Sequence, residues 1–192
     1  MSHKSIQPVA TESIVVSFLL TKAKEIGRWG LTPLQVNKLA FILHGWTLGL
    51  LERPLFDNSP KRIQAWRYGP VVVGIYHTLK PFGNNLVTID HIKTRYQYGK
   101  GDPSKYEDVI SVDIEEFMQK DEDATGHLDW VYNIYSDLDG GQLINYTHRK
   151  GGPWDQCRAR GFEVLGLRGE KHIPDDVIYP YYKEYIQKNF YS

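Results

Sequence analysis

The chain has 192 residues, 41% of them hydrophobic and 24% charged, which suits one compact domain with a sizeable core and excludes wholesale disorder. Lys plus Arg and Asp plus Glu both total 23, so the formal net charge is zero and bulk binding to nucleic acid or to a membrane is not expected. The single cysteine, Cys157, excludes an internal disulfide and a thiolate zinc cluster. No secretory or membrane-spanning pattern opens the chain, so we expect a cytoplasmic protein.

The first predicted element is a helix over residues 11–26. Thr11 is a suitable N-cap, and the apolar residues that follow it recur at helical spacing. Gly27 can end the helix because glycine tolerates a positive φ.

The second predicted helix spans residues 32–51 and has the clearest start in the chain. Thr32 can cap it, Pro33 takes the first helical position, and Gln35 lies three residues after Thr32, as a capping box requires. Its apolar residues, Trp46 among them, form a stripe too broad for a surface helix. We therefore expect this helix to be central in the fold.

A short strand is predicted next, over the sequence RIQAWRY at residues 62–68, where side chains alternate in character. The pair Gly69-Pro70 breaks this strand. Pro70 is placed to open a helix that ends near Phe82, because proline is favoured at the first helical position.

Residues 84–125 differ from the rest, since charged residues and turn formers become more frequent. Two stretches show partial alternation, Val87–Ile92 and Tyr106–Ile114, with the loop signal GKGDPS between them. The segment is either a hairpin or an insertion.

The last third predicts four more helices, over residues 125–138, 140–149, from Pro153 onward and 174–190. Asp139 and Gln142 are spaced as a cap pair, and Pro180 should kink or delay the final helix. The predicted fold class is therefore mainly α: a single compact helical domain over residues 1–192, with a small β element and a central insertion.

No set of residues predicts catalysis or a metal site. Cys157 with His148 and Asp155 is the best nucleophilic set, but no recognisable motif surrounds the cysteine, so a packed thiol is favoured. No two of the seven histidines are three or four residues apart, and the glycine-rich stretches lack the spacing of a phosphate-binding loop. We expect no cofactor and no enzymatic activity.

A helix-turn-helix formed by the first two helices is also disfavoured. The second helix is apolar nearly all round and has Lys38 as its only basic residue, whereas a recognition helix presents polar side chains to base edges.

Two aromatic corners stand out instead, one at Trp66-Arg67-Tyr68-Gly69-Pro70 and one at Pro153-Trp154, which follows Thr147-His148. A purely structural corner explains each glycine-proline turn taken alone. Two such corners in one small helical domain are more than turn chemistry requires.

The residues around these corners resemble the Panacea antitoxin domain, which groups with SocA-type and GepA-type phage-associated proteins. The resemblance covers residues 14–83 and 126–186 and leaves 84–125 as a member-specific insertion. Its N-terminal elements are Leu31-Thr32, Gln35, Lys38-Leu39, Gly45-Trp46, Pro54-Leu55-Phe56, Ile63, Ala65-Trp66, Tyr68-Gly69-Pro70-Val71, Tyr76 and Phe82-Gly83. The C-terminal elements are Thr147-His148, Pro153-Trp154, Ile173-Pro174 and Tyr181-Tyr182.

This resemblance implies a mainly helical fold, a cytoplasmic bacterial or prophage setting, and neutralisation of a toxin encoded beside the protein by direct protein–protein binding. One branch of the family is associated instead with delivering the toxin to an energy-dependent AAA+ protease. The resemblance implies no catalytic activity. A Cys/His hydrolase and a DNA-binding autoregulator remain the less favoured alternatives.

We expect the binding surface to be one groove anchored by a few aromatic or arginine side chains, as protein interfaces commonly are. Trp66, Arg67, Tyr68 and Trp154 are predicted to line or support this groove, with Thr147 and His148 near its rim. Those predicted to serve the fold are Thr32, Gln35, Trp46, Gly69, Pro70 and Pro153. The rival hypothesis is that the first six also serve only the fold.

Overall fold

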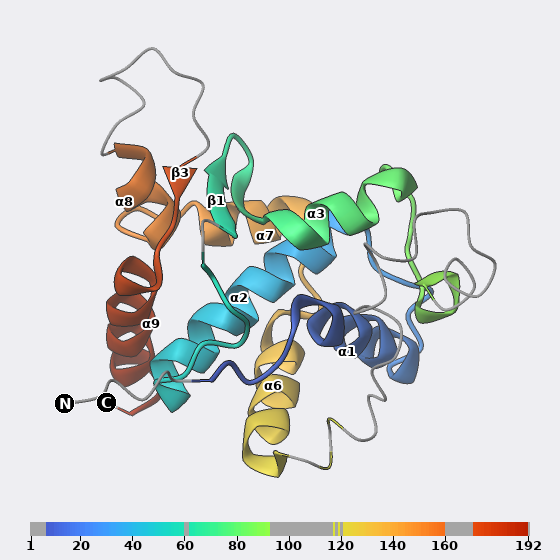
Figure 1. Cartoon of the computed structure of the whole chain (residues 1–192), viewed down its shortest axis with the longest axis horizontal. Coiled ribbons are helices and arrows are strands. Elements are labelled where there is room, and N and C mark those ends of the chain that lie inside the picture. The colour runs from blue at the N-terminus through green and yellow to red at the C-terminus, as the bar shows by residue number, and fades with distance from the viewer. Residues whose placement is uncertain are drawn as a thin grey trace.

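The structure is a computed structural model that describes residues 7–59, 62–92, 117, 119, 121–159 and 171–191. Helix α2 (Pro33–Leu51) runs through the middle of the molecule, and the other elements lie around it (Figure 1). Every residue of α2 from Val36 to Leu48 is buried. The prediction of a central helix is confirmed.

The start of α2 is held by the predicted capping box. The Gln35 backbone N–H donates to Thr32 Oγ1 at 3.3 Å, and the Thr32 backbone N–H donates to Gln35 Oε1 at 3.0 Å. Further along the helix, Trp46 is fully buried and its indole N–H donates to the Tyr135 hydroxyl at 3.1 Å. The capping box fixes where α2 begins, and the Trp46 hydrogen bond holds its C-terminal half against Tyr135.

Helix α9 (Asp175–Phe190) packs along α2 at close range. A Cβ on Gly45 would lie 2.2 Å from the Tyr182 ring, and one on Gly49 would lie 2.7 Å from Ile186. Glycine at these two positions therefore allows the helices to approach. Helix α9 begins at Asp175 and continues through Pro180, so this proline does not delay its start.

The remaining predicted helices are confirmed, with boundaries shifted by a few residues. Asp139 and Gln142 form a second capping box. The bounds are α1 (Glu12–Glu25), α6 (Glu122–Tyr135), α7 (Gly140–Thr147) and α8 (Pro153–Ala159). In Figure 1, α9 and α8 lie at one side of α2, and α1 and α6 at the other.

The predicted strand is instead one arm of a hairpin. Strand β1 (Ile63–Trp66) pairs antiparallel with β2 (Gly69–Val72), and β3 (Lys171–His172) adds to the other side of β1, in the order β2-β1-β3. The prediction that Pro70 opens a helix is wrong, because α3 (Val73–Leu79) starts three residues later.

A contact distant in sequence explains this difference. The Asn37 side chain on α2 donates to the Val72 carbonyl and accepts from the Val72 N–H, both at 2.9 Å, which keeps Val72 extended. Pro70 fits an edge strand because it has no N–H to leave unpaired.

The first strand of the hairpin expected in residues 84–125 does not form. Val87 makes a single bridge to Leu31, and residues 89–92 turn helical after the 3₁₀ helix η1 (Lys80–Phe82). Its expected second strand, Tyr106–Ile114, lies outside the described residues. That 84–125 is an insertion stays a prediction.

Candidate functional site

The turn between β1 and β2 carries the first aromatic corner and needs a glycine. Trp66 pairs with Gly69 across the hairpin, and Gly69 has a φ of 101°, which residues other than glycine rarely adopt. A Cβ there would lie 2.8 Å from Lys38 Nζ, 3.0 Å from Thr147 Oγ1 and 3.1 Å from His148 Nε2. The turn therefore brings together polar groups from α2 and α7.

Beside this turn lies a cavity of about 530 Å³, which we call the Lys38 pocket. Its described lining contains three basic side chains, Lys38, Arg67 and Lys80, and no carboxylate. Aromatic rings of Trp66 and Tyr76, 4.7 Å apart between centroids, form part of the wall. The lining residues are Pro33, Leu34, Asn37, Lys38, Trp66, Arg67, Tyr68, Val71, Tyr76, Lys80, Gly83 and Asn84.

Lys38 is the unusual member of this lining, because its side chain is only 3% exposed. Its ammonium donates to the Pro70 carbonyl at 2.8 Å and forms none of the ion pairs found among the described residues. Burial lowers the pKa of Lys38 to about 7. At neutral pH the amine is therefore close to half protonated.

The second aromatic corner lies behind the turn. The His148 ring stacks on Trp154 with centroids 3.7 Å apart, and the Trp154 indole N–H donates to the Trp66 carbonyl at 2.8 Å. Burial, followed by the charge on Lys38, lowers the pKa of His148. Its Nε2 is buried without a hydrogen-bond partner among the described atoms.

The six residues predicted for the groove thus lie in one neighbourhood, in two layers. Trp66 is half-buried, Arg67 and Tyr68 are exposed, and these three line the Lys38 pocket. Trp154 and Thr147 are buried behind the turn, and Thr147 donates to carbonyls of its own helix, so it does not lie at a rim. His148 is half-buried beside them. Their part in binding stays a prediction.

The prediction of site residues missed Lys38, Tyr76 and Lys80 as members of the pocket. One signal was present for Lys38, since it is the only lysine or arginine in a largely apolar helix. A lone cation at a buried position calls for a specific partner. Tyr76 and Lys80 carried no such signal, because their place depends on where α3 begins.

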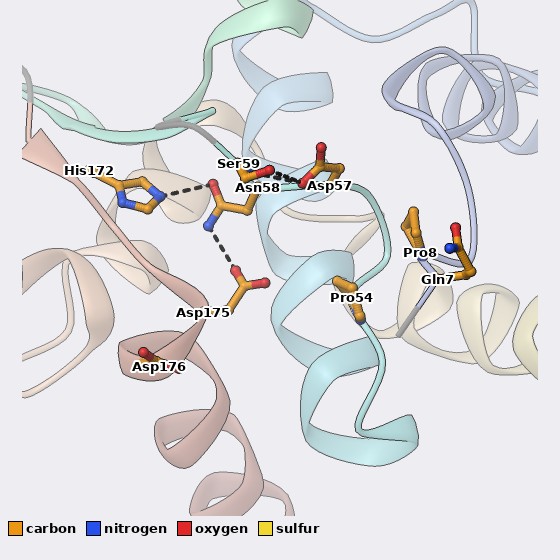
Figure 2. A pocket seen from close by; sticks show the side chains of 9 residues that line it. All are labelled: Gln7, Pro8, Pro54, Asp57, Asn58, Ser59, His172, Asp175 and Asp176. Atoms are coloured by element: carbon orange, nitrogen blue, oxygen red, sulfur yellow. Dashed lines mark hydrogen bonds between the residues drawn. The ribbon is translucent and has the colours of Figure 1, made fainter. Parts of the chain in front are cut away.

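A second cavity, of about 580 Å³, lies where α9 begins (Figure 2); we call it the Asn58 hollow. The Asn58 amide donates to Asp175 Oδ1 at 2.7 Å and to the Ile173 carbonyl at 2.9 Å, and its oxygen accepts from the Ile63 N–H at 2.8 Å. Its lining residues are Gln7, Pro8, Pro54, Asp57, Asn58, Ser59, His172, Asp175 and Asp176.

Asp175 and Asp57, two carboxylates of the Asn58 hollow, have partners. Buried His44 approaches Asp175 Oδ1 at 3.0 Å, and Ser59 donates to Asp57 through both its hydroxyl and its backbone N–H. Burial alone would raise the pKa of Asp175, but the hydrogen bonds from His44 and Asn58 outweigh it and hold that pKa below its ordinary value. The hydrogen bonds of Asn58 tie β1, β3 and the start of α9 together.

The residues considered for catalysis, Cys157, His148 and Asp155, come from α8 and from the C-terminal end of α7. Cys157 is buried in α8, and the Asp155 carboxylate accepts from the Gly151 N–H at 2.8 Å. The described residues contain no group of three or more His, Cys, Asp or Glu side chains placed to hold a metal ion. Within those same residues, no helix combines the length and apolarity needed to cross a membrane.

Comparison with known proteins assigns the family. Residues 36–155 match the family described as "Antitoxin SocA-like, Panacea domain". The chain belongs to this family. The matched range starts within α2, includes Lys38, the β1–β2 turn and Trp154, and ends before α9. The resemblance stated from the sequence is confirmed.

A curated relative of this Panacea domain protein is "Antitoxin SocA" from Caulobacter vibrioides (strain NA1000 / CB15N). The two are 26% identical over 154 residues, which are 80% of this chain and 73% of that relative. No solved structure matches the chain. Membership in an antitoxin family implies a cognate toxin as the partner.

Proposed function

We propose that this protein neutralises a cognate toxin by direct protein–protein binding, and that the toxin docks over the Lys38 pocket and the exposed β1–β2 turn. The family supports the first half of the proposal. The observation that carries the second half is a pocket with aromatic walls and three cations that holds no carboxylate among its described lining. The setting we propose is the cytoplasm of a bacterium, in a chromosomal or prophage operon.

The exposed turn has the composition of an interface anchor. Tyr68 is 60% exposed, and the Arg67 guanidinium lies 5.4 Å from its ring centroid. Tyrosine and arginine are enriched among the few residues that supply most of the binding energy, in interfaces of about 1,600 Å² in total. Neither side chain is needed to fill the core, so the surface can be altered while the fold is kept.

Rescue of growth tests this proposal. The toxic reading frame encoded beside this gene is expressed with the wild-type chain, with the double variant Arg67→Ala/Tyr68→Ala, or with Tyr191→Ala as a matched control. Tyr191 is a 75% exposed aromatic at the far end of α9. The double variant should lose rescue, and its dissociation constant for the toxin should rise at least about 30-fold, because two anchor side chains are removed.

The melting temperature separates binding from folding. It should be unchanged in the double variant, and the Tyr191→Ala protein should behave as wild type in both measurements. Full rescue by the double variant, or a parallel fall of rescue and melting temperature, would contradict the proposal. His148→Ala is less suitable, because its ring packs on buried Trp154 and the variant perturbs the corner itself.

The same cells distinguish inhibition from delivery to a protease. If the protein inhibits the toxin, the toxin persists during rescue and the purified pair is inactive without other components. If the protein is a protease adaptor, the toxin disappears faster when both this protein and an AAA+ protease are present, and rescue is lost in protease-deficient cells.

A further inference from the structure

The ammonium of Lys38 is incompletely partnered. The side chain is 3% exposed, and its described hydrogen bond is the one to the Pro70 carbonyl. An ammonium has three donors, and a buried charge is costly unless an opposite charge or several acceptors surround it. The protein therefore places a cation at the inner wall of a cavity without supplying the group that would balance it.

The groups around Lys38 reinforce this imbalance. His148 lies at the C-terminal end of α7, the β1–β2 turn contributes Arg67 and Tyr68, and α3 with η1 contributes Tyr76 and Lys80. None of these side chains is a carboxylate. From α8, Arg158 and Asp155 both act on His148, with opposite signs, and the Asp155 carboxylate is engaged by the Gly151 N–H. The pocket is therefore complementary to an anion.

The donors at the buried end of the pocket favour a singly charged anion, because Arg67 and Lys80 lie in its exposed part. Pro33 has no N–H, and the capping box occupies the donors of Thr32 and Gln35 at the start of α2. Asn37 is also committed, since its amide is paired with both backbone groups of Val72. A phosphate is normally held by several convergent N–H donors, whereas one buried ammonium matches one carboxylate.

We propose that an acidic side chain of the toxin enters the Lys38 pocket and that its carboxylate pairs with the Lys38 ammonium. The rings of Trp66 and Tyr76 enclose the methylene groups of that side chain, and Arg67 and Lys80 attract it from the more exposed part of the lining. This inference rests on the proposed function, because it names the chemical group by which the toxin is recognised.

Pairing with a carboxylate has a consequence for protons. In the free protein the pKa of Lys38 is about 7, and a carboxylate beside it raises that pKa because it stabilises the charged form. Above pH 7 the amine must take up a proton when the toxin binds. The dissociation constant then increases about tenfold for each pH unit above 7, until the pKa of the complex is reached.

Titration calorimetry of the purified toxin–antitoxin pair tests this, between pH 6 and 9 and in buffers of different ionisation enthalpy. Wild type is compared with Lys38→Met, which keeps most of the side chain's length and removes its charge, and with Lys183→Met as the matched control. Lys183 pairs with Glu52 at 2.7 Å, and Glu52 lies about 21 Å along α2 from Lys38. Titrating groups of the toxin itself act equally on all three proteins.

Above pH 7, wild type and Lys183→Met should take up a proton on binding, and their affinity for the toxin should fall about tenfold per pH unit. Lys38→Met should bind at least tenfold more weakly at pH 6, and the extra pH dependence and proton uptake should disappear. A Lys38→Met curve that runs parallel to wild type overturns the inference while leaving the proposed function in place. Absence of any complex overturns the proposed function itself.

A second measurement on the free protein identifies the anion. The ¹³Cε resonance of Lys38 is titrated with pH alone, with sodium acetate and with inorganic phosphate. Acetate should raise the measured pKa of Lys38, as the carboxylate assignment requires. A rise with phosphate and none with acetate overturns that assignment in favour of a small phosphate ligand.

Discussion

The two cavities described above differ in how their polar groups are paired. In the Asn58 hollow, the Asn58 amide donates to Asp175 (Figure 2). The same amide bonds to the Ile173 carbonyl and the Ile63 N–H, and Asp175 in turn pairs with His44. In the Lys38 pocket, the buried ammonium has one described hydrogen bond. The first cavity satisfies the polar groups of Asn58, and the second leaves the charge of Lys38 without a counter-charge.

This difference separates a structural role from a binding role. Polar groups that satisfy one another join segments distant in sequence, here β1, β3 and the start of α9. A buried charge without a counter-charge weakens the free protein and is of use only if a partner completes it. Variants in the two cavities should therefore change different properties.

The largest effect on stability is expected from Asn58→Ala. The change leaves the Ile63 N–H and the Ile173 carbonyl unpaired in the interior, so the free energy of unfolding should fall by about 3 kcal/mol. Urea unfolding measures this, with Ser59→Ala, an exposed neighbour, as the control within about 0.5 kcal/mol of wild type. Toxin affinity of the folded fraction should be unchanged; weakened binding would give this hollow a role in recognition.

A smaller loss of stability is expected from Gly69→Ala. The methyl group would meet Lys38 Nζ at 2.8 Å and Thr147 Oγ1 at 3.0 Å, and a φ of 101° is strained for alanine, so we expect a loss of about 2 kcal/mol. The matched control is Gly126→Ala on α6, where a Cβ meets nothing within 4 Å and stability should rise slightly. Equal behaviour of the two variants in thermal unfolding would show that the turn tolerates a side chain.

The smallest effect per pH unit is a slope of stability against pH, and Lys38→Met reveals it. The pKa of Lys38 is about 7 in the folded state and 10.5 ordinarily, so the unfolded chain binds more protons between these values. Wild-type stability should therefore rise relative to Lys38→Met by at most about 1.4 kcal/mol per unit as pH increases from 7 towards 10.

Below pH 7 Lys38 is protonated in both the folded and the unfolded chain, so the slope vanishes. Lys38→Met should then be more stable than wild type. His148 does not interfere above this pH, because its pKa is lowered from 6.5. Urea unfolding at several pH values measures the difference. A constant difference from pH 7 to 10 would mean that Lys38 is charged throughout and has an acceptor or counter-charge of its own.

Most of the fold could be predicted from the sequence, because its signals are local. The capping boxes at Thr32 and Asp139 and the apolar periodicity of α2 and α9 each depend on residues a few positions apart. The error at Pro70 arose because proline after glycine is equally suited to a helix start and an edge strand. Asn37, more than 30 residues earlier, decides between them by pairing with Val72.

The site was predictable only in part, for the same physical reason. Trp66, Arg67 and Tyr68 are contiguous, and their aromatic and cationic character drew attention to the turn that lines the pocket. The surroundings of the Lys38 ammonium come from the end of α7 and from the hairpin, which pack around it from distant parts of the chain. Sequence spacing alone does not show that a lysine lacks a counter-charge.

The close fit of α9 on α2 also sets an order in time. Residues 175–190 are synthesised after Gly45 and Gly49, so one flank of the central helix stays bare until the ribosome has added them. A nascent chain halted before Tyr182 has no ring to close that flank. A protease that unravels α9 would expose the same flank of the helix that carries Lys38.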